Sequence, residues 1–158
     1  MYEKYSHDEI AKIKAAIKRS LPPPPQLKKQ PLTYESKVLV VDDSLTVRKI
    51  LRRSFVDFGF DTEHIIEAVD GEDALCELME HAGVALIVTD VNMPKIDGLG
   101  LIACLSKNKD YQTINILLLT SENSDKLTAE ALRYGVDIFI KPFNKDTFFA
   151  YLIKMMVD

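Results

Sequence analysis

From residue 37 onward, short apolar runs alternate with longer segments in which apolar residues recur every three or four positions. The first pattern is typical of buried strands and the second of helices that bury one face. Because each of five strands is followed by a helix, the sequence predicts an α/β fold in which a five-stranded parallel sheet carries helices on both faces. The expected strands are 38–41, 64–68, 85–89, 114–119 and 138–140, and the expected helices are 45–58, 72–81, 99–107, 125–134 and 145–157.

Residues 1–36 follow a different pattern. Ser6 and Glu9 form an S-x-x-E capping box, which predicts the start of a helix. Four proline residues, Pro22–Pro25, end this helix and begin an extended segment. The chain therefore divides into an amphipathic helix with a Pro-rich linker, 1–36, and one globular domain, 37–158. The apolar stripe of the helix consists of Ile10, Ile13, Ile17 and Leu21.

Charge is distributed unevenly between these two parts. The leader, 1–36, has seven Lys/Arg and four Asp/Glu, whereas 37–158 has 13 and 20, so a small basic leader precedes an acidic domain. A net charge of −4 argues against a nucleic-acid-binding domain. The sequence has neither an apolar stretch long enough to span a membrane nor a signal peptide, and it predicts a cytoplasmic protein. Cys76 and Cys104 lack metal-ligand spacing and are expected to be buried free thiols.

Acidic residues follow two of the predicted strands. Asp42 and Asp43 come directly after 38–41, and Asp90 ends the run that begins near residue 85. Ligands of parallel sheets bind beyond the carboxyl ends of the strands, so these carboxylates are expected to share one pocket. Carboxylates this close repel one another unless a cation is present, and Mg²⁺ prefers such oxygen ligands. A simple helix cap remains an alternative for Asp43 or Ser44, but no helix is expected to start soon after Asp90.

A lysine and a threonine also follow predicted strands. Lys141 comes after the fifth strand, where it would be costly to desolvate without an anionic partner, and Thr120 ends the fourth. Alone, Thr120 would more often be a turn residue. Together these residues predict phosphoryl transfer to the carboxylate of Asp90, with Thr120 and Lys141 binding phosphoryl oxygens. The expected magnesium ligands are Asp42, Asp43, Asp90 and the backbone carbonyl of Asn92.

Four linked motifs resemble the response-regulator receiver family of two-component signalling, in particular its single-domain chemotaxis-type members. They are Val41-Asp42-Asp43-Ser44, Asp90-x-x-Met93-Pro94-x-x-Asp97-Gly98, Thr120-Ser121 and Lys141-Pro142-Phe143. The resemblance covers 37–158 and implies a flavodoxin-like sheet of order 2-1-3-4-5. It also implies phosphotransfer from a histidine kinase, dependence on Mg²⁺ and slow self-hydrolysis of the acyl phosphate.

The resemblance also assigns modulating positions. In the family, the side chains at Asn92 and Glu122 flank the attacking water, and Ser121 follows the conserved threonine position. Members often have Tyr or Phe three residues before the lysine, as a switch coupled to the threonine. Here that residue is Ile138, and the aromatic residue is its neighbour Phe139. The usual aromatic readout is therefore not expected in this chain.

Two other functions are alternatives to a stand-alone response regulator. A phosphatase with an aspartyl nucleophile needs a second acid two residues after the nucleophile, and Asn92 stands there. An interaction module that is not phosphorylated would not need the complete set of acids, threonine and lysine. We therefore expect a signalling protein rather than a turnover enzyme. Its expected partners are a histidine kinase, an unknown downstream protein bound through the 125–158 face, and a second copy bound through the leader helix.

Overall fold

The computed structural model describes residues 8–9, 11–12, 15, 30–122, 124–141 and 144–157. Five parallel strands form one sheet in the order β2-β1-β3-β4-β5, which confirms both the predicted fold class and the strand order implied by the resemblance. The strands are β1 (Lys37–Val41), β2 (Ile65–Ala68), β3 (Val84–Asp90), β4 (Asn115–Thr120) and β5 (Asp137–Ile140). The helices are α2 (Leu45–Phe58), α3 (Gly71–Glu80), α4 (Gly98–Ser106), α5 (Asp125–Tyr134) and α6 (Lys145–Val157).

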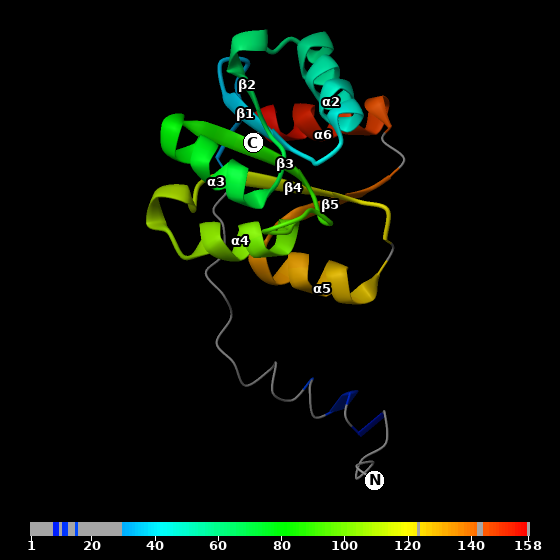
Figure 1. The fold of residues 1–158 in the computed structure, drawn as a ribbon. Helices are drawn as coiled ribbons and strands as arrows, with labels where there is room; N and C mark the ends of the chain where they lie inside the picture. Colours follow the sequence, from blue (N-terminus) through cyan, green and yellow to red (C-terminus); the bar gives the residue numbers. More distant parts are fainter. Residues whose placement is uncertain are drawn as a thin grey trace.

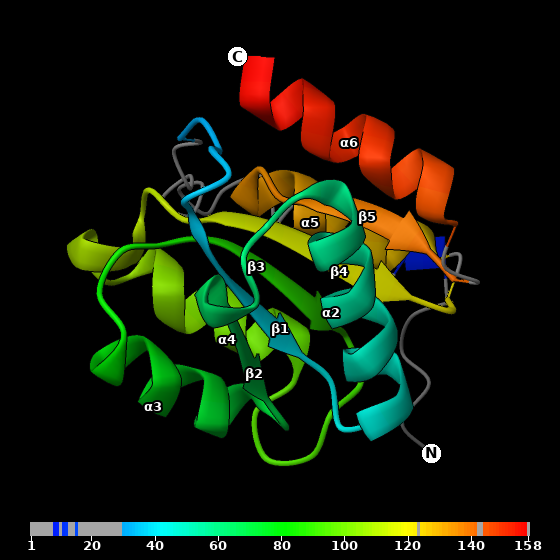
Figure 2. The ribbon, with the colours of Figure 1, turned by 90° about the horizontal axis from the view of Figure 1, so that it is seen from above.

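The helices cover the two faces of the sheet unequally. Helices α2 and α6 lie on one face, and α3, α4 and α5 lie on the other (Figures 1 and 2). Successive residues of β1 point to opposite faces, so Leu39 and Val41 enter the core beneath α3–α5 while Val38 and Val40 enter the core beneath α2 and α6. Both cores are apolar, which explains why the central strands have almost continuous hydrophobic sequences.

Local capping determines where several elements begin and end. Ser44 is the N-cap of α2, and its hydroxyl accepts a hydrogen bond from Val47 N. Gly135 closes α5 in the left-handed region, at a φ of 71°, which glycine adopts without strain. His64, expected to begin the second strand, instead ends a short 3-10 helix, Thr62–His64. Asp61 caps that turn by accepting a hydrogen bond from Glu63 N, so β2 begins one residue later.

The prediction that both cysteines are buried was wrong. Cys76 of α3 and Cys104 of α4 are exposed. The buried stripe of α3 contains Ala74 and Leu78, and Cys76 lies between these positions, on the opposite side of the helix. Apolar composition around a cysteine therefore did not indicate which face it occupies.

The segment Gln30–Ser36 packs against the domain, although the sequence analysis assigns it to the linker. Leu32 is 2% exposed and belongs to the core beneath α2 and α6. Its backbone N–H donates to Met155 O of α6 at 3.1 Å. The buried side chain of Asn115 donates to Gln30 O at 2.7 Å, and the ring centroid of Tyr34 lies 6.0 Å from that of Phe58. Segment 30–36 is thus attached through both side-chain and backbone contacts.

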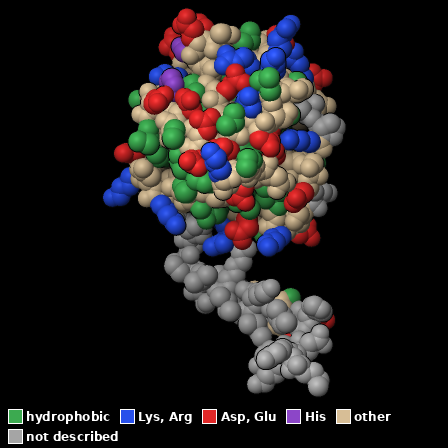
Figure 3. Space-filling view, viewed as in Figure 1, with side chains coloured by type: hydrophobic (Ala, Val, Ile, Leu, Met, Phe, Trp, Pro, Cys, Tyr) green, Lys and Arg blue, Asp and Glu red, His purple; other side chains and the backbone are tan. Residues whose placement is uncertain are grey.

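Only five residues of the predicted leader helix fall within the described part of the chain. Asp8, Glu9, Ala11, Lys12 and Ala15 have helical backbone and are exposed. The rest of that helix, the four prolines, and Pro142-Phe143 lie outside the described residues. Among the residues that the structure describes, no helix is long and apolar enough to cross a membrane. On the face seen in Figure 3, acidic and basic side chains are intermixed with hydrophobic ones.

Candidate functional site

Three aspartates meet at the carboxyl edge of the sheet. Asp42 and Asp43 follow β1, and Asp90 ends the neighbouring strand β3. One carboxylate oxygen from each of the three residues lies within 4.8 Å of the others. Asp42 is buried and Asp43 is exposed, and the side chain of Asp90 is 13% exposed. The structure therefore brings together the three acids that the sequence predicted to converge.

Asp42 has one satisfied and one unsatisfied carboxylate oxygen. Oδ1 accepts a hydrogen bond from Ser44 N at 2.8 Å, whereas the buried Oδ2 has no hydrogen-bond partner. Burial raises the pKa of the Asp42 carboxyl above its usual value, and the negative charge of Asp90 adds to this rise. The hydrogen bond from Ser44 and the charge of Lys141 oppose the rise. A buried oxygen without a hydrogen bond, next to two further carboxylates, suits a hard divalent cation.

Lys141 extends over the acids from the end of β5. Its backbone N–H donates to Thr120 O at 2.7 Å, which continues the pairing of β4 with β5. Its Nζ lies 3.5 Å from Asp90 Oδ1 and 3.7 Å from Asp42 Oδ2. These distances exceed those of hydrogen bonds and describe an ion pair with room between the charges. The expectation that Lys141 has anionic partners is thereby met.

Thr120 ends β4 at the same edge and is fully buried. Its Oγ1 accepts a hydrogen bond from Glu122 N at 2.9 Å, which is a turn interaction. The simple interpretation of Thr120 as a turn residue thus describes the hydroxyl in this structure. Ser121, the next residue, is exposed. A hydroxyl oxygen that accepts still has its own hydrogen to donate, so this turn bond leaves the Thr120 hydroxyl able to bind a further acceptor.

Asn92 and Glu122 approach each other from the loops that follow β3 and β4. Asn92 Nδ2 lies 3.4 Å from Glu122 Oε1, the long limit of a hydrogen bond. Both residues are exposed, and each lies two positions after a residue of the predicted site, Asp90 or Thr120. The contact joins the loop after the acceptor strand β3 to the loop after the adjacent strand β4. Its length indicates a weak and readily broken bond.

The loop after Asp90 is held tightly against the strand that carries it. Val91 N donates to Asp90 Oδ1 at 2.8 Å, and Gly98 N donates to Val91 O at 2.8 Å. A Cβ atom on Gly98 would lie 2.4 Å from Asp90 O, so only glycine fits there. Lys95 within this loop has a φ of 63°, which is uncommon for a residue with a side chain. In the sequence Gly98 stands out only as part of a motif, whereas the structure shows why the position requires glycine.

Ile138 and Phe139 point to opposite faces of the sheet. Ile138 packs against the core beneath α3–α5. Phe139 packs toward α6, with its ring centroid 5.1 Å from that of Tyr151 and 6.4 Å from that of Phe148. Because adjacent strand residues alternate between faces, Phe139 cannot substitute for an aromatic residue at position 138. This geometry supports the inference that the usual aromatic readout is missing.

Comparisons with known proteins agree with this geometry. The family model of the response regulator receiver domain matches residues 38–153. The chain is 36% identical over 108 residues to a chemotaxis protein CheY homolog of Campylobacter jejuni, which covers 68% of this chain and 82% of that protein. Identity to chemotaxis protein CheY1 of Helicobacter pylori is 35% over 108 residues, covering 68% and 86%.

A solved structure extends the likeness to three dimensions. The chemotaxis protein CheY4 of Vibrio cholerae matches with a TM-score of 0.68 at 31% identity, over 77% of this chain and 98% of that protein. The chain therefore belongs to the response regulator receiver domain family, whose general function is to accept a phosphoryl group in signalling.

Proposed function

We propose that this receiver works as a stand-alone response regulator that accepts a phosphoryl group on Asp90 and signals through protein contacts that depend on phosphorylation. The observation that carries the proposal is the convergence of Lys141 Nζ on Asp90 Oδ1 and Asp42 Oδ2, at 3.5 and 3.7 Å. A structural salt bridge would close to hydrogen-bonding distance around one carboxylate. Here the lysine lies between two carboxylates and is available to an incoming anion.

The two oxygens of Asp90 have different surroundings. Oδ1 accepts the Val91 N–H and faces Lys141, so it is engaged by two positive or donating groups. We assign the nucleophilic role to Oδ2. Attack of this oxygen on a phosphohistidine breaks the phosphorus–nitrogen bond, and the leaving imidazole takes up a proton. Lys141 then stabilises the charge on the transferred phosphoryl oxygens.

The aspartate cluster fits Mg²⁺. The buried Asp42 Oδ2 has no hydrogen-bond partner, and Asp43 and Asp90 supply further carboxylate oxygens within 4.8 Å. We assign Asp42, Asp43, Asp90 and the backbone carbonyl of Asn92 as the residues that would hold the ion. Bound there, the cation neutralises charge on the phosphoryl group during transfer.

Thr120 and the loop residues supply the response. The Thr120 hydroxyl would donate its own hydrogen to a phosphoryl oxygen while it still accepts from Glu122 N, so the phosphoryl group would pull on the 121–122 turn through this bond. Asn92 and Glu122 are proposed to control access of water to the acyl phosphate, because their side chains meet beside the acceptor. Ser121 and Ile138 are proposed to modulate this response. Ile138 cannot report it through an aromatic ring, so we propose that the signal reaches partners through the backbone of the turn.

The proposed partners are a histidine kinase and a downstream protein. The face formed by 125–158 exposes Leu132, Ile140 and Ile153, which are 69%, 51% and 54% exposed. These side chains come from α5, from the edge strand β5 and from α6, so we propose that a partner protein docks along this edge of the sheet. Pull-down experiments with and without the phosphoryl mimic beryllofluoride would test whether this face binds a target only in the activated state.

The phosphorylation step is tested by intact mass spectrometry. Incubation with acetyl phosphate and Mg²⁺ should add the mass of one phosphoryl group to the protein, and Asp90→Ala should abolish the gain. Asp110 is an exposed acid in the 3-10 turn Lys109–Tyr111, which precedes β4, so Asp110→Asn serves as a matched control and should still gain the mass. Turnover of a generic phosphomonoester would instead support a phosphatase, and absence of any adduct would support an unphosphorylated interaction module.

The leader offers a separate proposal, a homodimer formed through the amphipathic helix. Light scattering of the full chain and of a chain that begins at residue 30, which keeps Leu32 in the core, compares the two masses. We expect the full chain to have twice the mass of its own monomer and the shorter chain to be monomeric. Monomers in both samples would remove the dimer from the proposal without affecting the chemistry of Asp90.

A further inference from the structure

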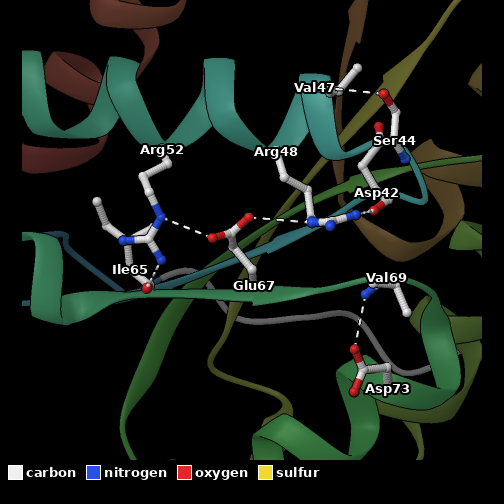
Figure 4. Close-up of polar contacts among 9 residues, drawn as sticks. All are labelled: Asp42, Ser44, Val47, Arg48, Arg52, Ile65, Glu67, Val69 and Asp73. Atoms are coloured by element: carbon white, nitrogen blue, oxygen red, sulfur yellow. Dashed lines mark hydrogen bonds and ion pairs between the residues drawn. The ribbon is translucent and has the colours of Figure 1, made fainter.

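Two arginines of α2 hold the same glutamate of β2. Arg48 and Arg52, one helical turn apart, point from α2 toward the sheet and meet Glu67 (Figure 4). Arg48 Nε lies 3.3 Å from Glu67 Oε1, and Arg52 Nε lies 2.9 Å from Glu67 Oε2. Each arginine therefore uses one carboxylate oxygen, and Glu67 is shared between them.

The remaining donors of the two arginines go to different places. Arg48 Nη1 donates to the backbone oxygen of Asp42 at 2.7 Å. Arg52 Nη1 and Nη2 instead donate to Thr62 O and Ile65 O, at 3.1 and 2.8 Å. Both sets of contacts attach α2 to the sheet, but only that of Arg48 reaches the chain segment that carries the acids. The side chain of Arg48 is 12% exposed, so its hydrogen bond is largely shielded from water.

The oxygen that Arg48 holds belongs to the peptide that joins Asp42 to Asp43. This peptide is planar, so fixing the direction of its carbonyl also fixes the direction in which Asp43 leaves. On the preceding side, Asp42 N donates to Ala68 O at 3.1 Å. On the following side, Ser44 N donates to Asp42 Oδ1 at 2.8 Å. Arg48 therefore completes the set of bonds that determines where both carboxylates point.

We propose that Arg48 is a positioning residue, which orients the Asp42–Asp43 peptide so that both carboxylates face the cation, and that Glu67 orients Arg48. The inference rests on the proposed metal site. In it Arg48 does not contact the cation but acts through Asp42 and Asp43. Arg48 shares its charge with Glu67, so its effect comes from the geometry of the peptide rather than from attraction of the acids. A purely structural role, as a link between α2 and β2, would make Arg48 and Arg52 equivalent.

The test compares Arg48→Gln with Arg52→Gln in the full chain. Each variant removes one contact between an arginine of α2 and Glu67 of β2, so Arg52→Gln is a matched control. Mg²⁺ is titrated into the unphosphorylated protein, and binding is followed through the amide resonances of residues 42–44 in ¹⁵N NMR spectra. Loss of an outer-shell partner typically weakens metal binding about 10–100-fold, so we expect Arg48→Gln to raise the dissociation constant for Mg²⁺ roughly tenfold. Arg52→Gln should leave it within about twofold of the wild type, while both variants unfold at lower temperature.

Arg48→Lys is a second variant that keeps a donor for Asp42 O but lacks the planar fork that also holds Glu67. We expect an intermediate Mg²⁺ affinity, which keeps the test decisive if Arg48→Gln does not fold. Three results would each overturn the proposal. Arg48→Gln and Arg52→Gln could weaken Mg²⁺ binding equally, Arg48→Gln could leave the Mg²⁺ affinity unchanged, or the wild-type protein could bind no Mg²⁺. A wild-type protein that binds Mg²⁺ but gains no mass with acetyl phosphate would refute phosphoryl acceptance alone, and the difference between the arginines would still be visible.

Discussion

Replacing Leu32 with alanine tests whether segment 30–36 is part of the folded domain. Leu32 lies 2% exposed in the core beneath α2 and α6, although it precedes the first strand. Full burial of a leucine side chain contributes about 1.5–3 kcal/mol, and Leu→Ala in a core costs about 2–5 kcal/mol. Undocking of the whole segment would cost only the free energy of its attachment, which sets an upper limit on the loss. We therefore expect Leu32→Ala to lower the free energy of unfolding by about 2–3 kcal/mol, at the lower end of the range for core substitutions.

Urea denaturation followed by circular dichroism measures this change, and thermal unfolding should show a fall of roughly 4–12 °C at about 2–4 °C per kcal/mol for a chain of this size. Leu132→Ala removes the same atoms from a side chain that is 69% exposed, so it should cost less than about 0.5 kcal/mol. The attachment also includes backbone bonds. A chain that begins at residue 30 should therefore keep full stability, whereas one that begins at residue 37 should lose at least as much as Leu32→Ala. If Leu32→Ala is as mild as Leu132→Ala, or the two shortened chains are equally stable, segment 30–36 does not contribute as described.

Three further substitutions test the site and the edge of the fold. Gly98→Ala would place a Cβ 2.4 Å from Asp90 O. It should therefore lower the free energy of unfolding, measured by urea denaturation, by about 1–3 kcal/mol and slow the mass gain with acetyl phosphate. Wild-type values in both assays would contradict this contact. Asp42→Asn should raise the melting temperature of EDTA-treated protein near pH 7, because burial raises the pKa of Asp42 and the folded state therefore disfavours its charge. This gain in melting temperature should shrink as the pH falls through the pKa of Asp42 in the folded state. A lower melting temperature of the variant at pH 7 would refute this explanation. Tyr151 donates to Asp137 Oδ2 at 3.0 Å, and burial raises the pKa of the Tyr151 hydroxyl well above its ordinary value. The stability that this shift contributes is present below about pH 10 and is lost as the pH rises further. Tyr151→Phe should therefore lower the free energy of unfolding by about 1–2 kcal/mol at pH 8 and by less at pH 11. The same loss at both pH values would argue against titration of this hydroxyl.

Much of the fold could be predicted because its signals are local. Helices 45–58, 125–134 and 145–157 were predicted with the bounds that the structure shows, since each has clear polar residues before its apolar stripe. The position of the acids could also be predicted, because the carboxyl ends of parallel strands necessarily meet at one edge. Asp42, Asp90 and Lys141 follow three different strands, and this placement alone was enough to indicate their contact.

Other features depend on contacts between distant segments, which spacing does not encode. Arg48 resembles any basic residue on a helix surface, and nothing in its neighbours indicates the bond to Asp42 O. Leu32 is a single apolar residue in a polar, proline-rich stretch, so no periodicity marks it as buried. The hydrogen bond of Asn115 to Gln30 O joins residues 85 positions apart. These contacts are determined by three-dimensional packing rather than by local propensity.

The two edges of the sheet contribute to stability with opposite sign. At the carboxyl edge, three carboxylates lie within 4.8 Å of one another, and Asp42 Oδ2 is buried without a hydrogen bond, so the metal-free fold is destabilised there. At the amino edge, segment 30–36 adds a buried leucine and bonds to Asn115 and Met155. Sites that bind charged ligands generally keep such unfavourable groups because function needs them, and the rest of the fold must offset the cost. A receiver that carries this acidic cluster therefore benefits from packing far from the cluster, where added stability does not act on the residues of the proposed site. Segment 30–36 meets that condition, since its contacts lie at the end of the sheet opposite to the aspartates.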